Sequence, residues 1–263
     1  MASYVSLTSA DNPAVKQAAR VRDSAAARRR LGLFFAEGAR LCADAARSGV
    51  PIHTCFFTPG AREKYKRETS LLSEQAARCF EISEKVCRKL SDTSAPQGVF
   101  CLCAQRAEPD GAFDAQGRYL ALENVSDPSN LGACARTAEA LGIAGLILSP
   151  GCCDPYNAKA LRASMGAFFR LPLLLPEDFP ALLQKKQAEG FRIYGSVPDR
   201  AAINIAEVPK PGCICLVGNE GNGLTEEAKA LCDRLVTIPM PGRAESLNAA
   251  AAAAILMWEL MKP

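Results

Sequence analysis

Apolar and polar positions along the first 105 residues alternate in a way that predicts short strands separated by helices. Asn12-Pro13 opens a helix within the first thirty residues, because asparagine caps helices and proline is favoured at their first position. The other predicted elements are helices at Glu37–Ser48, Leu71–Arg78 and Ser83–Leu90, and strands at Ile52–Phe57 and Val99–Cys103. This alternation favours a small α/β sandwich.

The same kind of pattern restarts after residues 106–117, a stretch rich in Gly, Asp and Ala that reads as a linker. Strands are predicted at Tyr119–Leu122, Leu146–Leu148, Arg192–Val197, Cys213–Val217 and Leu235–Ile238, with a further apolar segment at Leu171–Leu175. Helices are predicted at Leu131–Leu141, within Asn157–Ser164, and at Pro180–Glu189, Thr225–Leu231 and Leu247–Leu260. Strands followed by helices indicate an α/β fold with a mostly parallel sheet covered on both faces. The predicted division is a first domain at 1–107, a linker at 108–117 and a second domain at 118–263.

The last predicted helix is apolar on every side. Ser246 is a candidate N-cap, and LNAAAAAAILMW follows it. A helix of this kind is either buried or shared with a partner subunit. A homodimer and an ordinary monomer core both remain open at this point.

Composition narrows the class of protein. The chain has 263 residues, of which 49% are hydrophobic and 22% charged, as in globular proteins with a core. No apolar run approaches the roughly 20 residues that span a bilayer, and the N-terminus shows no secretory signal pattern. We therefore expect a soluble cytoplasmic protein. Its 12 cysteines include the alternating pairs Cys101/Cys103 and Cys213/Cys215, which are typical of buried reduced thiols in strands, and a metal site is not expected.

Charge is distributed unevenly along the chain. The net charge is +3 overall, +5 through Asp110 and −2 beyond it, and the first thirty residues alone carry +4. A basic N-terminal part suggests a polyanionic partner such as nucleic acid. A solvated helix face would give the same count, so both interpretations stay open.

Several nucleotide and hydrolase chemistries lack their motifs. GxxxxGK[ST], GxGxxG and HExxH are all absent. The single histidine, His53, lies in an apolar strand, where a structural role is favoured over a hydrolase triad.

Three segments of the second half depart from ordinary strand and helix sequence. The first, residues 123–142, places Asn130 at a predicted helix cap and Arg136 within the helix that follows. Open α/β sheets bind ligands at the carboxyl ends of their strands, so Arg136 can project toward such a ligand. A surface arginine is the alternative.

The second and third segments are stiff or glycine-rich loops that each follow a strand. VGNEGNGL, residues 217–224, contains Gly218 and Glu220, and TIPMPGRAESLNAA, residues 237–250, contains Ser246 and Asn248. Loops of this kind offer backbone N–H and C=O groups to a planar ring. Because the glycine-rich loop carries no Lys or Arg, a nucleoside cofactor without a phosphate chain is favoured.

Together these segments resemble, in order and spacing, the three motifs of SpoU/TrmH-type RNA ribose methyltransferases of the SPOUT superfamily. NVSDPSNLGACARTAEALG, VGNEGNGL and IPMPGRAESLNAAAAAAIL carry the likeness, which spans roughly residues 118–263. More loosely, NPAVKQAARVR, FFAEGARLCADA and SDTSAPQGVFCL resemble the family's substrate-binding domain, which is similar to RNA-binding ribosomal proteins.

This resemblance implies a trefoil-knotted catalytic domain, a homodimer and S-adenosylmethionine held by the backbone of the second and third motifs. By position, Gly218, Ile238, Met240 and Leu247 would contact the cofactor. The implied acceptor is a ribose 2′-hydroxyl of ribosomal or transfer RNA, with ribosomal RNA slightly preferred because of the ribosomal-protein-like first domain. In SLNAA, alanine stands where many members of the family have a β-branched residue, which is a packing change.

The resemblance also assigns catalytic positions. Arg136 matches the family's catalytic arginine, Asn130 and Glu220 match polar active-site positions, and Ser246 and Asn248 match the third motif. Since a guanidinium is effectively never neutral in proteins, we expect Arg136 to hold RNA phosphate and stabilise alkoxide charge, with Glu220 orienting it. The leading hypothesis is an S-adenosylmethionine-dependent RNA 2′-O-methyltransferase. The alternative is an inert RNA-binding protein with the same fold.

Overall fold

The computed structural model describes residues 4–106 and 113–262, which form two compact units. The first unit contains the described residues through Arg106 together with Tyr156–Phe169. The second contains the described residues of 113–155 and 170–262. Residues 107–112, which are the end of the predicted first domain and the first part of the predicted linker, lie outside the described residues. In the remainder of the linker, Phe113 packs against Tyr119, with ring centroids 4.2 Å apart.

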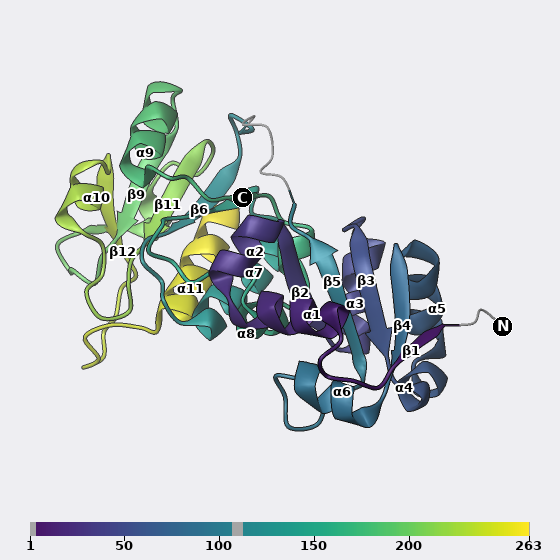
Figure 1. Cartoon of the computed structure of the whole chain (residues 1–263). Helices are drawn as coiled ribbons and strands as arrows, with labels where there is room; N and C mark the ends of the chain where they lie inside the picture. Colours follow the sequence, from purple (N-terminus) through teal and green to yellow (C-terminus); the bar gives the residue numbers. More distant parts are fainter. Residues whose placement is uncertain (1–3, 107–112, 263) are drawn as a thin grey trace. The chain divides into compact units, whose positions relative to one another are not determined.

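A five-stranded mixed sheet forms the centre of the first unit, in the order β1-β4-β3-β5-β2 (Figure 1). Its strands are β1 Val5–Leu7, β2 Leu33–Glu37, β3 Ile52–Phe57, β4 Arg78–Ile82 and β5 Val99–Ala104. Its helices are α1 Pro13–Asp23, α2 Ala25–Leu31, α3 Ala39–Arg47, α4 Pro59–Lys64, α5 Lys66–Gln75, α6 Glu84–Leu90, α8 Ala158–Ser164 and the short η1 Ala167–Phe169.

The predicted helix in the first thirty residues is two helices. Asn12 caps α1 as expected, its side chain accepting a hydrogen bond from the Ala14 backbone amide at 2.9 Å. Ser24 then ends α1 and caps α2 by accepting from the Ala27 amide. The buried Arg28 guanidinium holds this break, because it donates to the Val21 and Arg22 carbonyls at 2.9 and 2.8 Å. The apolar pattern continues across the break, so the sequence alone did not reveal it.

Two more predictions for this unit were wrong at the boundary between strand and helix. Glu37, the predicted start of a helix, ends strand β2, and α3 starts only after Gly38. Arg78, the predicted end of a helix, starts β4, which lies between β1 and β3. Both strands are five residues long and are defined by pairing with distant strands, which a local pattern does not record.

Helices α1 and α6 cover one face of this sheet. Val15, Ala18 and Val21 of α1 and Val86 and Leu90 of α6 pack with the strand side chains of that face. Strand residues of opposite parity, such as Cys55 and Cys101, face the other side, where α3 and α5 lie. The α/β fold predicted for this part of the chain is therefore present, with helices on both faces of its sheet.

The segment Tyr156–Phe169 belongs to the first unit although it lies far along the chain. The Phe34 ring stacks on the rings of Tyr156 and Phe169, with centroids 5.0 and 5.7 Å apart. The Arg106 guanidinium donates to the Phe169 carbonyl at 2.7 Å. The helix predicted within Asn157–Ser164 thus exists as α8, in a segment that completes the core of the unit formed by the N-terminal part of the chain.

The second unit is built on a seven-stranded sheet that is parallel throughout, in the order β10-β12-β9-β11-β6-β7-β8. Its strands are β6 Arg118–Leu122, β7 Gly145–Leu148, β8 Leu173–Leu174, β9 Arg192–Ser196, β10 Ile203–Asn204, β11 Cys213–Val217 and β12 Arg234–Thr237. Its helices are α7 Pro128–Leu141, α9 Phe179–Ala188, η2 Ile205–Glu207, α10 Glu226–Ala230 and α11 Ala249–Met261.

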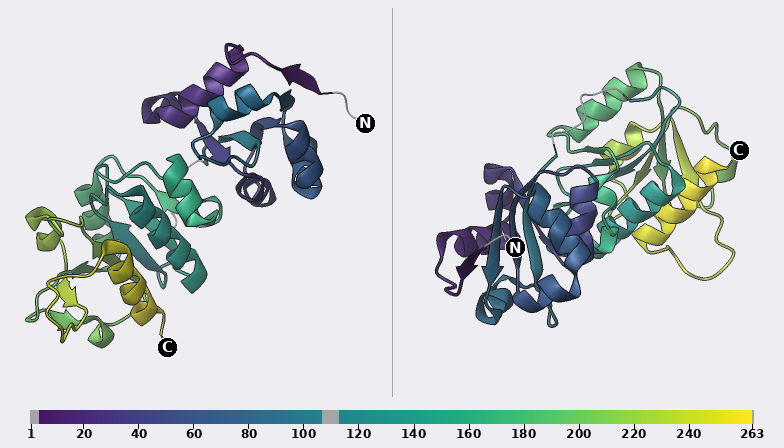
Figure 2. Two further views of the ribbon diagram at one scale, coloured as in Figure 1. Left: turned by 90° about the horizontal axis from the view of Figure 1, so that it is seen from below. Right: turned by 90° about the vertical axis from the view of Figure 1, so that its right-hand side faces the viewer.

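Helices cover both faces of this sheet, as the pattern predicted. Helices α7 and α11 lie side by side on one face, α11 against β6 and β11 and α7 against β7 (Figure 2). On the other face, Phe179 and Leu183 of α9 and Ala228 of α10 pack against strand residues such as Ile193 and Ile214. Small side chains such as Ala135, Ala138 and Ala253 fill the space beneath α7 and α11 and allow close approach.

The caps of these two helices differ from the prediction. Asp127, not Asn130, caps α7, and its carboxylate accepts from the amides of Ser129 and Asn130. Asn248, not Ser246, caps α11 and accepts from the Ala250 and Ala251 amides at 3.0 and 3.3 Å. Proline at the first position of α7 explains the earlier start. The displaced cap leaves the Asn130 side chain free for another partner.

None of the twelve cysteines is in a disulfide, and most of them are buried. Burial raises the pKa of Cys134, of Cys213 and of Cys232 to about 12, so these thiols stay protonated at neutral pH. Within residues 4–106 and 113–262, the His, Cys, Asp and Glu side chains form no group that could hold a metal ion. In the same ranges, no helix is both long and apolar enough to cross a membrane.

Candidate active site

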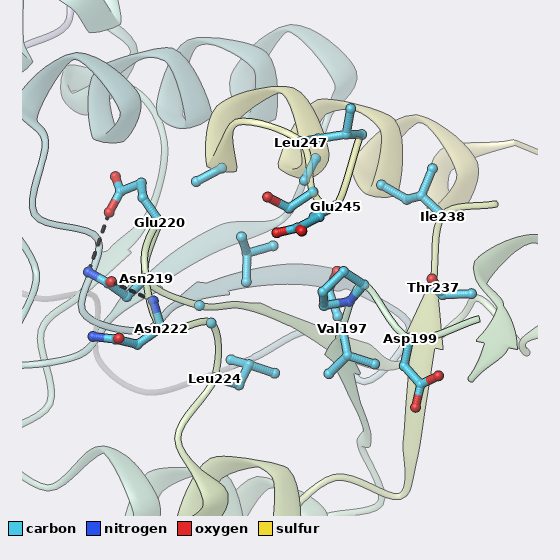
Figure 3. A pocket seen from close by; sticks show the side chains of 18 of the residues that line it. Val197, Asp199, Asn219, Glu220, Asn222, Leu224, Thr237, Ile238, Glu245 and Leu247 are labelled. Atoms are coloured by element: carbon cyan, nitrogen blue, oxygen red, sulfur yellow. Dashed lines mark hydrogen bonds between the residues drawn. The ribbon is translucent and has the colours of Figure 1, made fainter. Parts of the chain in front are cut away.

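A pocket of about 590 Å³ opens at the carboxyl ends of β9, β11 and β12. Figure 3 shows Leu247 on one side of this pocket and Val197 and Leu224 on the opposite side. Parallel α/β sheets bind ligands at this edge, because loops from neighbouring strands diverge there. The volume lies in the usual range for a small-molecule site. Its lining comes from three loops, at residues 196–199, 217–224 and 237–249, with Lys229, Leu235 and Ala252.

The loop after β11 is folded on its own main chain. The backbone of Asn219 pairs with that of Gly223, and the Asn219 side-chain oxygen accepts from the Gly221 and Asn222 amides at 2.9 and 3.1 Å. Gly218 is buried at the start of this loop, where a Cβ would lie 2.2 Å from the Gly223 carbonyl carbon. Only glycine allows this close approach of two backbone segments.

Two residues that follow β6, Glu123 and Asn124, fix this loop near both of its ends. The Asn219 side-chain amide donates to the Asn124 carbonyl at 2.9 Å, and Asn124 has a left-handed backbone with φ of 56°. The buried Glu123 carboxylate, directly after β6, accepts from the backbone amide and the hydroxyl of Thr225 at 2.9 and 2.7 Å. A buried carboxylate requires such partners, so the far end of the loop is fixed to β6.

A hydrogen-bonded set of three side chains lies beside the pocket. Asn248 donates from its amide nitrogen to the Asn130 oxygen at 3.1 Å, and Asn130 donates to the Glu220 carboxylate at 2.8 Å. These residues come from the start of α11, the first turn of α7 and the loop after β11. The arrangement joins all three sequence segments singled out above.

Most of the predicted site residues meet at this pocket. The predicted cofactor contacts Gly218, Ile238, Met240 and Leu247 all line it, as do Glu220 and Ser246. Asn130 and Asn248 are outside the lining. Asn130 is hydrogen-bonded directly to Glu220, and Asn248 is hydrogen-bonded to Asn130.

Arg136 is placed differently. It is exposed on α7 and lies outside the pocket lining, and its side chain forms no hydrogen bond or ion pair within the described part of the chain. Glu220 is bonded to Asn130 and Asn219 rather than to Arg136. Within one chain, Glu220 therefore does not orient Arg136.

One wall of the pocket was missed by sequence reasoning. Ser196, Val197, Pro198 and Asp199 follow β9 and line the pocket, although they form no recognisable motif. The available signal was their place at the end of a strand predicted to be parallel to β11, since such strand ends share one edge of a sheet.

The charges of the pocket select among ligands. Its lining contains three carboxylates, Asp199, Glu220 and Glu245, and one cation, Lys229. This balance disfavours a polyphosphate and suits a ligand that carries positive charge. The fold and the site thus define an α/β protein whose pocket, at the carboxyl ends of parallel strands, suits a nucleoside-sized ligand without a phosphate chain.

Comparison with known proteins identifies the family. The SpoU rRNA Methylase family matches residues 117–258, and the MRM3-like substrate binding domain matches residues 12–101. The 23S rRNA (guanosine(2553)-2'-O)-methyltransferase RlmP of Bacillus subtilis is 31% identical over 234 residues, covering 89% of this chain and 90% of RlmP.

Solved structures agree with the sequence matches. An AdoMet-bound rRNA methyltransferase from Sinorhizobium meliloti has a TM-score of 0.85 at 29% identity, covering 97% of this chain and 96% of its own. The SpoU methyltransferase AviRb from Streptomyces viridochromogenes, solved in complex with AdoMet, has a TM-score of 0.84 at 27% identity, covering 95% and 97% of the two chains.

The chain belongs to the SpoU rRNA methylase family. The family expected from the three segments is thereby confirmed, and the α/β fold of both units is that of its solved relatives.

Proposed function

We propose that this protein transfers a methyl group from S-adenosylmethionine to a ribose 2′-hydroxyl of RNA. The observation that carries the proposal is the main-chain pocket at the strand ends, with the bonded set Asn248–Asn130–Glu220 beside it. Relatives that cover nearly the whole chain are named as ribose 2'-O-methyltransferases of ribosomal RNA or were solved with AdoMet.

The residues present fit this cofactor. The Gly218 backbone lies in a cradle that a Cβ would fill, and the apolar side chains of Ile238, Met240 and Leu247 offer contact area without charge. The pocket carboxylates suit the positive charge of a sulfonium. S-adenosylmethionine, when bound, supplies this group as the methyl donor. Gly218, Ile238, Met240 and Leu247 would hold the nucleoside portion.

The chain's own polar residues then act on the acceptor. Asn130, fixed between Asn248 and Glu220, is a preorganised group that can position the ribose. The Arg136 guanidinium would hold an RNA phosphate and stabilise negative charge that develops on the 2′-oxygen. Ser246 lines the pocket and adds a hydroxyl.

Ribosomal RNA is the proposed substrate in preference to transfer RNA. RlmP is named as an enzyme of 23S rRNA, and the chain covers 90% of its length. We further propose that residues 1–107 bind the RNA and residues 118–263 carry out the transfer. The match of residues 12–101 to a substrate binding domain supports this division.

The activity is tested with the full chain, tritiated S-adenosylmethionine and ribosomal RNA from cells that lack the gene. We expect label to enter this RNA, not RNA from cells with the gene, and to map to a single ribose. Transfer RNA from the same cells is the parallel substrate. Binding of RNA without label incorporation, and without heat of S-adenosylmethionine binding in calorimetry, would instead support an inert RNA-binding protein.

A second copy of the chain is the proposed partner of α11. Ala251, Ile255 and Trp258 are exposed on one side of this helix, and Trp258 is 56% exposed. An apolar stripe left open to solvent marks an interaction surface. The homodimer expected from the apolar terminal helix is therefore retained as a proposal.

Replacing Trp258 by glutamate is expected to convert a dimer into a monomer, because the change places a charge in the apolar interface. Light scattering after size exclusion should show the mass falling from twice to once the chain mass of 28.0 kDa. Val5→Glu, at an apolar side chain that is 64% exposed in the first unit, is the matched control and should leave the mass unchanged. A monomeric wild-type chain would refute the proposal.

A trefoil knot is the proposed topology of the second unit. After β12, at one side of the sheet, the chain returns across the pocket to α11, which packs on α7 near the middle of the sheet. This return and the family membership support threading of the C-terminal segment through an earlier loop. An experimental structure with an unthreaded C-terminal segment would contradict it.

A further inference from the structure

Three helices of the first unit concentrate positive charge. Helices α1, α2 and α6 together contain nine Lys and Arg against two acidic residues, a net charge of +7. Helices α3, α4 and α5 contain six Lys and Arg against four acidic residues, a net charge of +2. The net charge of α1, α2 and α6 alone exceeds the net charge of the entire chain, which is +3.

Tertiary structure brings α6 to α1, although about sixty residues separate them in sequence. Both helices pack on the same sheet face, and the Arg22 guanidinium at the end of α1 donates to the Lys89 and Ser91 carbonyls at 2.9 and 3.1 Å. At the other end of α1, Lys16 chiefly lowers the pKa of Asp11, and Lys85 and Lys89 contribute. The cations of the two helices therefore act on one region of space.

The basic side chains of α1 and α6 are arranged along exposed helix faces. Lys16 and Arg20 are one turn apart on α1, and Lys85 and Lys89 are one turn apart on α6, next to Arg88. All five are exposed. We call these five residues the basic face.

Little within the chain neutralises this face. Lys16 pairs with the highly exposed Asp11 at 2.8 Å, a contact of small energetic value in solvent. The side chains of Arg20, Lys85, Arg88 and Lys89 form no hydrogen bond or ion pair with any residue that the structure describes. Arg29 and Arg30 of α2, which contacts α1, are exposed and equally unpaired among the described residues.

We propose that the basic face of α1 and α6 is where the first unit holds the sugar-phosphate backbone of its RNA. This inference rests on the proposed function and assigns the RNA contact to one of the two helical faces of the unit. Unpaired Lys and Arg on neighbouring helices match a row of phosphates, and their binding releases counterions from the RNA. Such contacts position RNA without reading its sequence, so they set affinity and orientation for the second unit to act.

The test compares two charge-reversed double variants of the full chain. Lys85→Glu with Lys89→Glu changes the basic face, and Lys66→Glu with Arg67→Glu makes the same charge change on exposed residues of α5. Binding to purified large-subunit ribosomal RNA is measured over a series of potassium chloride concentrations. Melting temperature and the calorimetric affinity for S-adenosylmethionine are recorded for each variant.

We expect the α6 variant to bind RNA at least about tenfold more weakly and its salt dependence to become shallower by about two counterions. The α5 variant should differ from wild type by only a few-fold, and both should keep the wild-type melting temperature and cofactor affinity. KM for RNA in methylation should rise in the α6 variant while kcat changes little.

Equal losses in both variants would mean that only total charge matters and would overturn the proposal. Unchanged RNA affinity in the α6 variant would also overturn the proposal. The partner of the basic face would then be an acidic protein. Failure of the proposed function is separate: wild-type protein would then bind RNA through the basic face and transfer no methyl group to any RNA.

Discussion

Replacing Arg136 by alanine is expected to lower methyl transfer to RNA by at least about a hundredfold, the usual cost of removing a group that stabilises developing anionic charge. The loss should fall on kcat as well as on KM for RNA, because the guanidinium would interact with both phosphate and the reacting oxygen. Single-turnover transfer from labelled S-adenosylmethionine to ribosomal RNA measures the effect. Arg136→Lys keeps the charge but not the planar fork of donors, so it should recover only part of the rate.

The surroundings of Arg136 distinguish a role in methyl transfer from a role in protein stability. Arg136 is exposed and outside the pocket lining, and its side chain has no hydrogen-bonding partner among the described residues. Its replacement should therefore leave the melting temperature and the calorimetric affinity for S-adenosylmethionine unchanged. Wild-type rates in the alanine variant would remove Arg136 from the mechanism, and the exposed arginine would then be a surface residue.

Replacing Gly218 by alanine is expected to abolish measurable S-adenosylmethionine binding, and methyl transfer with it. The added Cβ would lie 2.2, 2.3 and 2.4 Å from backbone atoms of Gly223 and Leu224. Backbone cannot rotate away as a side chain does, so the loop must open and the pocket wall must move. Calorimetric titration measures the loss, and each tenfold weakening corresponds to about 1.4 kcal/mol of binding free energy.

Gly221→Ala, in the same loop, is the control variant for Gly218→Ala. A Cβ there would have the Asn219 side-chain oxygen as its nearest neighbour, at an ordinary 3.5 Å. Gly221→Ala should therefore fold normally and bind S-adenosylmethionine with a much smaller loss. If Gly218→Ala bound the cofactor as well as Gly221→Ala does, the cofactor would not lie against this loop. Circular dichroism of both variants distinguishes a local loop change from general unfolding.

Much of the second unit could be predicted from local pattern. Runs such as CICLV, residues 213–217, are buried throughout, and the structure places strands at each of the five predicted segments. The glycine and proline positions of the loops after β11 and β12 could be read directly as loop chemistry. The predicted cofactor contacts Gly218, Ile238, Met240 and Leu247 meet at one pocket because those loops leave adjacent strands of a parallel sheet.

Predictions that depended on the exact start of a helix were less successful. The side chains of Asn130 and Ser246 were both assigned to caps, but Asp127 and Asn248 have that role. Several residues near each start are capable of capping, and packing of the helix decides among them. The division of the first helix at Ser24 has the same cause, since a buried arginine stabilises the break.

The sequence by itself determined the family, the glycine-rich and proline-rich loops and most strands, because these depend on the order of neighbouring residues. Only the tertiary structure decided that Asn130 bonds to Glu220, 90 residues away, and to Asn248, 118 residues away. It also decided that Tyr156–Phe169 completes the first unit and that the cations of α6 lie beside those of α1. Such contacts follow from how strands pair and helices pack across the whole chain, which no local stretch of sequence contains.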